Sequence, residues 1–340
     1  MPRRSLGPLI AALSVLGASV LVAPPSLADS ARLEIPPKEV TVTAANSSDI
    51  TRTAQGARLL DTFAQRLRSP GVPADFREQR DPTDDYRVLS VDVRKALPDP
   101  RCERETETVI LPRTVTGIRY LKGSPDPREN SDPCLVTVKW DDDVALNVQD
   151  DAGGGQRSAA EKAAASLEEY GSYCASRTYK SGRWYMWCHK KFVLKNDGNS
   201  TWNYYGIESW NSCQATQKGR DVSRFLTSCG RGQEVSRGSS SWVDYSPDQG
   251  NTTGACRSID LSLSVGWVGI GGSYNHCEEQ RVYLYSDGGK MSSYWKGKSE
   301  YLRTTRHRAS IKVPQAQGRP RWSHWSNSQA VVCLFVCTPA

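Results

Sequence analysis

Few side chains in the sequence stand in a pattern that performs known chemistry. The sequence has four histidines, which are His189, His276, His307 and His324. A catalytic histidine needs a nucleophile and an orienting partner within hydrogen-bonding distance. The chain has neither the H-E-x-x-H pattern of zinc proteases nor the G-x-S-x-G turn of serine hydrolases. The stretch from Ser293 to Lys296 matches S-x-x-K without its accompanying motifs. We therefore expect a protein that is not an enzyme, with a hydrolase whose site the fold assembles as the alternative.

Neither the histidines nor the acidic runs predict a metal site or a cofactor. His189 stands in an alternating stretch beside two lysines, which favours a surface side chain. The acidic runs 141–143 and 149–151 lack the D-x-[DN]-x-[DN]-G loop of calcium sites, so we interpret them as a solvated acidic edge. A glycosidase would need two carboxylates at a defined separation. The carboxylates considered for such a pair are Glu208, Asp244, Asp260, Glu278, Glu279 and Glu300.

Aromatic and basic residues gather in the C-terminal half of the chain. Nine of the ten tryptophans follow residue 170, and residues 296–321 hold eight Lys or Arg against Glu300 alone. Aromatic rings on a sheet face suit a sugar ring, and basic residues suit anionic envelope polymers or lipid head groups better than nucleic acid in an exported protein. A covering layer over the aromatic residues and a solvated basic face are the alternatives. The candidate ligand-binding residues are Trp202, Tyr204, Trp322, Trp325, Arg319 and Arg321.

The alternating stretch between Cys256 and Cys277 raises the possibility of membrane insertion. Ile259, Leu261, Leu263, Val265 and Trp267 share one face of a strand, and Ser258, Asp260, Ser262, Ser264 and Gly266 share the other. This alternation fits a membrane-inserting strand of about 9–11 residues. It also fits any half-buried antiparallel strand.

Two further features of the same stretch favour the half-buried antiparallel strand. The expected return strand, within 278–287, alternates over few residues, and disulfides at Cys256 and Cys277 would restrain insertion. We therefore interpret the apolar face as the inner face of an extracellular sheet, with Gly269, Gly271 and Gly272 where the strand bends or ends.

The N-terminus and the cysteines indicate an exported protein. Arg3 and Arg4 precede an apolar run over residues 9–22 and a small-residue stretch that ends at Ala28. This pattern predicts a secretory signal peptide over residues 1–28. Its apolar run, residues 9–22, is too short for a membrane anchor. An even number of cysteines in an exported chain predicts disulfides. The ten cysteines expected to pair are Cys102, Cys134, Cys174, Cys188, Cys213, Cys229, Cys256, Cys277, Cys333 and Cys337.

Charge divides the chain into two expected modules. Residues 29–170 hold 20 Lys+Arg and 26 Asp+Glu (net −6), and residues 171–340 hold 22 and 11 (net +11). We expect a flexible lead-in at 29–56, a small acidic α+β module at 57–149, a Gly-rich linker at 150–157 and a helix at 158–172. A basic disulfide-rich β domain at 173–340 would follow. Removal of the first module by processing at the linker is left open.

The elements that carry the candidate residues predict a mainly β protein. Helical spacing predicts a helix over 57–69, and residues 182–195 and 201–210 predict a hairpin turned by Asn196, Asp197 and Gly198. The C-terminal half is expected to form an antiparallel β sandwich or partly closed barrel. Cys102 is expected to pair with Cys134, and Cys333 and Cys337 are expected to bond elsewhere if they lie on one extended strand.

The favoured function is a secreted binding protein for carbohydrate or anionic cell-envelope polymer. The hydrolase is the first alternative, and a membrane-active or pore-forming protein is the second. No later stretch of the chain is long and apolar enough to be expected to span a membrane.

Overall fold

A computed structural model describes the chain from Glu39 onward, with gaps. The described residues are 39–69, 72–73, 76, 85–98, 106–125, 134–142, 166–179, 182–215, 223–235, 240–246, 250–252, 257–260, 263–265, 268–270, 273–276, 280–284, 290–333 and 337–339. Contacts divide the chain at Pro36, and all described residues belong to the unit Pro37–Ala340. The predicted signal peptide lies outside them.

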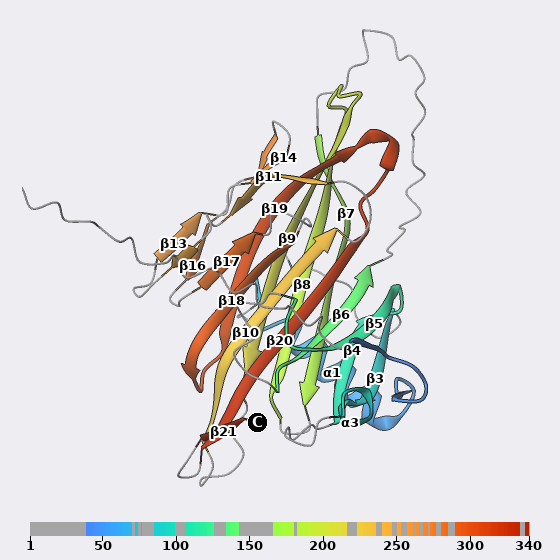
Figure 1. The fold of residues 1–340 in the computed structure, drawn as a ribbon, viewed down its shortest axis with the longest axis vertical. Coiled ribbons are helices and arrows are strands. Elements are labelled where there is room, and N and C mark those ends of the chain that lie inside the picture. Colours follow the sequence, from blue (N-terminus) through green and yellow to red (C-terminus); the bar gives the residue numbers. More distant parts are fainter. Residues whose placement is uncertain are drawn as a thin grey trace, which may run out of the picture. The chain divides into compact units, whose positions relative to one another are not determined.

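The described residues form two large antiparallel sheets (Figure 1). The first sheet has the order β1 (Glu39–Thr41), β5 (Val115–Lys122), β6 (Val136–Asp142), β20 (Trp322–Cys333), β10 (Ser223–Val235), β18 (Met291–Ser299), β17 (Gln280–Leu284) and β12 (Gly250–Thr252), and β21 (Cys337–Pro339) also pairs with β20. The second sheet has the order β11 (Ser241–Ser246), β19 (Arg303–Pro314), β9 (Trp202–Gln214), β8 (Trp184–Lys195), β7 (Ser166–Tyr179), β4 (Thr106–Pro112), β3 (Tyr86–Asp92) and β2 (Ser47–Asp49).

The two sheets share one hydrophobic core. Trp140 on β6 of the first sheet packs against Trp187 on β8 of the second, with ring centroids 4.7 Å apart. Tyr120, Leu226 and Trp295 extend this core, which buries alternate residues of both sheets. Burying one face of each sheet against the other is the arrangement of a β sandwich, so the expected mainly β, antiparallel architecture is confirmed.

A helix covers part of the outer face of the second sheet. Helix α1 (Ala54–Leu67) begins after Thr53, whose hydroxyl accepts the Gly56 N–H at 3.0 Å and caps the first turn. Its Phe63 packs on Tyr86 of β3, with ring centroids 5.5 Å apart. The same cluster includes Met186 on β8. A second, short helix is α3 (Val93–Ala96). Among the described residues no helix is long and apolar enough to cross a membrane.

The predicted helix near 57–69 and the predicted hairpin are both present. Strands β8 and β9 pair antiparallel, and Asn196 (φ 56°) and Gly198 (φ 67°) adopt the left-handed backbone in the turn. Both faces of β8 carry aromatic residues because both faces are covered: Trp187 lies in the core between the sheets, and Trp184 packs on the cluster beside α1.

The expected helix at 158–172 is wrong where it can be compared. Residues from Ser166 onward form β7, which pairs with β8 from Ser166 opposite Lys195 to Thr178 opposite Trp184. Helix-forming Glu168 and Glu169 therefore join a strand, because ladder pairing with a long neighbour outweighs a weak local preference. Residues 158–165 and the expected linker 150–157 lie outside the described residues.

The sheets also differ from the expected division into modules. Strand β4 pairs with β7, and β6 pairs with β20, so strands from the range 57–149 complete both sheets of the range 173–340. The lead-in differs likewise, since β1 pairs with β5 and β2 pairs with β3. Charge asymmetry along the sequence does not mark a boundary here because strand pairing joins distant segments.

Two disulfides are fully described. Cys174 and Cys188 lie directly opposite each other on β7 and β8, and Cys213 on β9 joins Cys229 on β10, linking the two sheets. Cys134 is also disulfide-bonded. Its predicted partner Cys102 lies outside the described residues, so that pair stays a prediction.

The C-terminal cysteines do not lie on a single extended strand. Cys333 ends β20 and Cys337 begins β21, and the antiparallel register places them opposite each other. The expectation that these two bond elsewhere depended on one uninterrupted strand, and the chain reverses instead.

Candidate functional site

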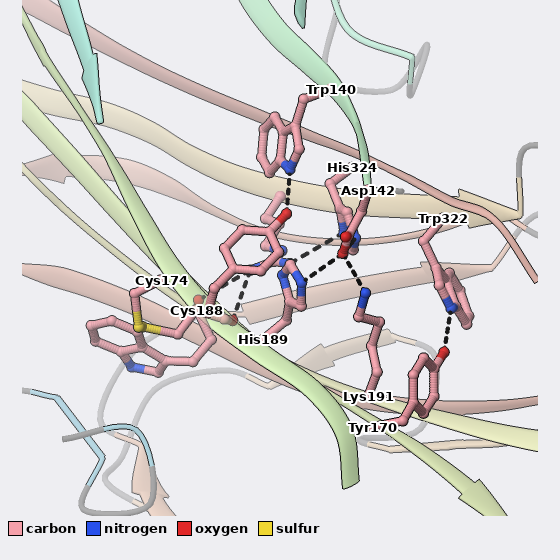
Figure 2. Close-up of polar contacts among 12 residues, drawn as sticks. Trp140, Asp142, Tyr170, Cys174, Cys188, His189, Lys191, Trp322 and His324 are labelled. Atoms are coloured by element: carbon pink, nitrogen blue, oxygen red, sulfur yellow. Dashed lines mark hydrogen bonds and ion pairs between the residues drawn. A yellow bond between two sulfur atoms is a disulfide. The ribbon is translucent and has the colours of Figure 1, made fainter. Parts of the chain in front are cut away.

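A group of ionisable side chains lies buried between the two sheets and centres on Asp142 (Figure 2). Asp142 ends β6 and follows Val138 and Trp140 in the alternation of that strand, so it points with them toward the second sheet. From β8, Lys191 Nζ donates to Asp142 Oδ2 at 2.6 Å, and His189 Nε2 lies 3.1 Å from the same oxygen. From β20, His324 Nε2 lies 3.5 Å from it. We call Asp142, His189, Lys191, Arg231 and His324 the core charge cluster.

Arg231 on β10 determines which nitrogen of His189 carries the proton. Its Nη2 lies 2.9 Å from His189 Nδ1, and a guanidinium can only donate. Nδ1 of His189 must therefore accept, which leaves the proton on Nε2, where it is donated to Asp142. The same guanidinium donates to the carbonyl oxygen of Cys188 at 2.8 Å and lies 3.4 Å from His324 Nδ1. His189 and His324 stack with ring centroids 4.3 Å apart.

Burial and neighbouring charges shift the pKa values of these groups. Burial lowers the pKa of His189 well below its ordinary 6.5, and the neighbouring His324 lowers it further. Burial likewise lowers the pKa of His324 to about 4. Burial alone would raise the pKa of Asp142, but Lys191 and the hydrogen bond from His189 outweigh it, so that pKa lies well below 3.8. At neutral pH the cluster therefore holds an ionised carboxylate and neutral imidazoles.

The cluster fits an internal charge network better than a metal centre. Ligand atoms of Asp142, His189 and His324 lie within 4.8 Å of one another, close enough to converge on a cation. A metal at His189 Nε2 would need that nitrogen without its proton, and Nδ1 would then carry a proton against Arg231. Lys191 already neutralises the carboxylate at 2.6 Å. The donors that surround the cluster therefore oppose a metal ion in this geometry.

A second buried polar group lies nearby in the sandwich. His307 on β19 contacts Ser293 Oγ on β18 through Nδ1 at 2.6 Å and Gln233 Oε1 on β10 through Nε2 at 2.9 Å. The serine–histidine contact is the type a hydrolase needs, but both side chains are fully buried. Burial lowers the pKa of His307 well below 6.5, and Arg231 adds to the effect.

A buried ion pair joins β4 to β7 within the second sheet, and its arginine also contacts the first sheet. Arg177 Nη2 donates to Glu107 Oε2 at 2.8 Å, and Arg177 Nη1 donates to the carbonyl oxygen of Ser326 on β20 at 3.0 Å. Burial would lower the pKa of Arg177, but Glu107 outweighs it and raises that pKa. This pair is fully satisfied and links the sheets.

The structure corrects three interpretations of single residues. His189 is fully buried and not a surface side chain, because the first sheet covers the face of β8 that carries it. Asp142 is buried as well, and Asp141 is half-buried and paired with Arg119, so these two do not form the expected solvated edge, and Asp143 lies outside the described residues. Glu208 is paired with Arg306 and with Arg308, at 2.9 Å to Arg308 Nη2, which gives it a structural role.

The six predicted ligand-binding residues do not form one surface. Trp322 and Trp325 are both buried, on opposite faces of β20, and Trp322 Nε1 donates to Tyr170 OH at 3.1 Å. Their expected place on a binding surface is therefore wrong, since both faces of β20 are covered. Trp202 and Tyr204 are half-buried on β9, Arg319 is half-buried over the ring of Tyr170, and Arg321 is exposed.

The alternating stretch forms a hairpin with itself. Strand β13 (Arg257–Asp260) pairs with β16 (Ser273–His276), and β14 (Leu263–Val265) pairs with β15 (Val268–Ile270). Asp260 pairs with Ser273, and the residues three positions further toward the turn, Leu263 and Ile270, pair with each other. The two pairings therefore have the same register. The described return strands are therefore β15 and β16. The expected return strand within 278–287 is wrong, since β17 pairs with β12 and β18.

This register sorts the hairpin by polarity. It pairs apolar or aromatic residues with each other, namely Ile259 with Tyr274, Leu263 with Ile270 and Val265 with Val268. It pairs small or polar residues with each other, namely Ser258 with Asn275, Asp260 with Ser273 and Ser264 with Gly269. Directly opposed residues of an antiparallel pair belong to the same face of the hairpin. Gly269 thus belongs to the small, polar set of the return strand.

The turn end of the hairpin, at Val265 and Val268, packs on the second sheet. Val265 is fully buried in a small cluster with Leu194 of β8, and Leu167, Tyr204 and Val268 pack against it. Leu167 and Leu194 are directly opposite each other on β7 and β8. Strand β14 also lies against β11 and β19.

Comparison of the chain with protein-family models gave no match, and comparison with curated proteins gave none either. The function is therefore argued from the residues and contacts of this chain.

Sequence reasoning missed the core charge cluster. Its members come from β6, β8, β10 and β20, so no local motif contains two of them except His189 and Lys191. One signal was present: Asp142, His189 and His324 each share strand parity with tryptophans, at Trp140, Trp187 and Trp322. Ionisable residues that alternate in phase with large apolar residues indicate burial.

Proposed function

We propose that the protein is a membrane-active protein that inserts the hairpin Arg257–His276 into a lipid bilayer. The observation that carries this proposal is the register between the pair Ser258–Asn275 and the turn, which pairs apolar or aromatic residues with each other and small or polar residues with each other at the described positions. A membrane-inserted hairpin needs this division, because one face meets lipid and the other meets water. Arg257 opposite His276 places a basic pair at the open end of the hairpin, on the side of Ile259 and Tyr274.

The length of the hairpin also supports insertion. Each arm spans nine positions of the sequence, 257–265 and 268–276, of which seven are described as strand. This span fits the about 9–11 residues of a membrane-spanning strand. Hairpin backbone groups pair within the hairpin except at its two edges, and edges in lipid must be paired as well. Several copies assembled side by side, each contributing one hairpin, would satisfy those edges.

The docked hairpin supports a stored form of the same segment. Among the described side chains of the hairpin, Val265 packs against Leu194 of the sandwich, with Val268 beside it. Burying one or two such side chains contributes about 1.5–3 kcal/mol each. A dock of that size is weak enough to release when apolar residues gain a lipid surface.

A matched pair of substitutions tests the proposal. Leu263→Lys places a charge in the apolar set, and Ser264→Lys places the same charge in the polar set one residue away. Charge on a lipid face costs up to about 2–4 kcal/mol near the bilayer centre, and charge on a water-facing position costs little. Release of a trapped dye from phosphatidylcholine–phosphatidylglycerol vesicles should be lost in Leu263→Lys and kept in Ser264→Lys.

The result that would overturn membrane insertion is equally specific. Absence of dye release by the wild-type protein at every pH between about 7.5 and about 4.5, or equal release by both lysine variants, contradicts the proposal. Thermal unfolding of both variants in solution controls for misfolding, and a variant that loses its cooperative transition is replaced by the matched pair Ile259→Lys and Ser258→Lys.

Export is part of this proposal. The predicted signal peptide at residues 1–28 and the disulfides Cys174–Cys188 and Cys213–Cys229 support a mature chain that starts at Asp29 outside the cell. N-terminal sequencing of protein recovered from the culture medium tests it, and an intact Met1 in that fraction would contradict it.

A second candidate function is the binding of an anionic envelope polymer. It is favoured by Lys312, whose Nζ lies 4.8 Å from the centroid of the half-buried Trp202 ring, beside Tyr204 in the register of β9 and β19. Cation–π pairs of this kind accompany anion and sugar recognition on a surface. Retention of the full chain on insoluble anionic polysaccharide, lost in Trp202→Ala with Lys312→Ala and kept in Lys190→Ala, would support it. Equal retention of all forms would contradict it.

A further inference from the structure

The core charge cluster and the dock of the hairpin are carried by the same two strands. His189 and Lys191 lie on β8, and Lys191 is three residues before Leu194 on the same strand. Leu194 packs against Val265 of the hairpin. Strand β7 carries Tyr173, which packs edge-on against His189 at 4.0 Å between ring centroids, and Leu167, which faces Leu194. The position of this β7–β8 end thus depends on the packing of the cluster and supports the hairpin.

The cluster contains more positive than negative charge even before any histidine is protonated. Lys191 and Arg231 face the single carboxylate of Asp142. The other titratable groups that face the histidines are Tyr173 on β7, whose pKa burial raises well above 10, and His307 on β19. Glu107 on β4 is paired with Arg177 and gives the cluster no spare negative charge.

Protonation of either histidine would break contacts in this cluster. A proton on His189 Nδ1 would meet the N–H groups of Arg231, which now donate to that atom at 2.9 Å. A protonated His324 would place a third cation beside Lys191 and Arg231, with Asp142 already shared. Unpaired charge in a dry interior is strongly unfavourable, so the sheets must separate locally to admit water.

We propose that the core charge cluster is an acid-sensitive latch, which loosens the β7–β8 end of the sandwich when the histidines take up protons and so releases the hairpin. This inference rests on the proposed membrane activity and adds its regulation. A shift of population needs only that protons bind the loosened state better than the closed state. In the closed state the pKa of His324 is about 4, against an ordinary 6.5, so protons bind the closed state less well than the loosened state.

The test is the pH profile of dye release from the same vesicles, recorded between about pH 7.5 and about pH 4.5, where ordinary histidines titrate. Wild-type release should rise steeply as the pH falls. The double variant His189→Gln with His324→Gln keeps a donor toward Asp142 and an acceptor toward Arg231 but cannot titrate there. Its release should stay low at about pH 5 and rise only at lower pH. Lys190→Gln, adjacent on β8 and half-exposed, is the matched control and should follow the wild type.

The outcomes separate the latch from the membrane activity. Release by the wild type that does not depend on pH, or an unchanged profile in the double variant, overturns the latch and leaves membrane insertion standing. Lack of release at every pH overturns the proposed function itself. Thermal unfolding at neutral pH checks that the double variant folds. If it does not, His324→Gln alone should shift the profile in the same direction by a smaller amount, and an unshifted profile in that single variant also overturns the latch.

Discussion

The ammonium group of Lys191 and the carboxylate of Asp142 form a contact of 2.6 Å between the two sheets, with both side chains almost fully buried. The contact joins the middle of β8 to the end of β6. Removal of one partner leaves the other as an unpaired charge in a dry interior.

Lys191→Met should therefore destabilise the fold by about 3–5 kcal/mol, as loss of one member of a buried ion pair does. Urea unfolding followed by tryptophan fluorescence measures the change. Lys190→Met, on the next residue, removes only a half-exposed pair with Glu169 at 3.7 Å and should cost less than about 1 kcal/mol. Similar losses in the two variants would contradict the assignment of Lys191 to the interior.

Stability should fall as the pH drops below the ordinary histidine value. Above 6.5 the three buried histidines of the sandwich are neutral whether the chain is folded or unfolded. Below it the unfolded chain binds protons that buried His189, His307 and His324 bind only at lower pH, to about 4 for His324. The free energy of unfolding should decrease by up to about 1.4 kcal/mol per pH unit for each histidine.

Urea titrations at several pH values measure this dependence. Asp142 acts in a separate window: its folded pKa lies well below 3.8, so the stability it contributes is present above that value and lost only in stronger acid. His324→Gln should make the slope between about pH 6.5 and about pH 4.5 shallower. A free energy of unfolding that stays constant over that range would disprove the burial of neutral histidines.

Gly232 on β10 leaves room for Trp325 on β20. A Cβ at this position would lie 2.0 Å from Trp325 Cζ2 and 2.7 Å from the carbonyl oxygen of Met291, so both neighbours would have to move. Gly232→Ala should destabilise the fold by about 1–3 kcal/mol or more, through overpacking. Gly198→Asn is the control, because Gly198 has open space and a left-handed φ that asparagine tolerates. A thermal midpoint of Gly232→Ala equal to that of the wild type would refute this packing.

The register also predicts two further disulfides, Cys256–Cys277 and Cys333–Cys337. Cys256 and Cys277 directly follow the pair Arg257–His276 outward along the hairpin, and Cys333 pairs with Cys337 in register. We expect both pairs to be bonded, together with Cys102–Cys134. Mass spectrometry of peptides digested without reduction identifies the pairs. A peptide that joins Cys256 to Cys333 or Cys337 would contradict the predicted pairing.

The sequence predicted much of the strand content and little of the pairing. Alternation located β8, β9 and the outward arm of the hairpin, because the side-chain period of a strand is visible locally. The return arm was expected within 278–287 because Gly269 was interpreted as a strand end, whereas Gly269 pairs with Ser264 in the small, polar set. The place of Asp142 beside His189 depends on which strands become neighbours, and no local pattern carries that information.

The helix expected at 158–172 failed for a related reason. Alanine and glutamate favour helix in isolation, but β4 and β8 each offer a long ladder to residues 166–179. The tryptophans were expected at a surface because one face of an antiparallel sheet often meets water. Here the first sheet and α1 cover opposite faces of β8, so Trp187 packs in the core between the sheets.

The most direct test of membrane insertion measures the environment of single hairpin residues. The described cysteines are all disulfide-bonded, so an introduced cysteine can be labelled alone with an environment-sensitive fluorophore. On addition of phosphatidylcholine–phosphatidylglycerol vesicles at about pH 5, where the histidines take up protons, the emission of label at Leu263→Cys should shift to shorter wavelength, and label at Ser264→Cys should keep the emission of a water-exposed probe. An unchanged emission at both positions, or the same shift at both, would contradict insertion of the hairpin.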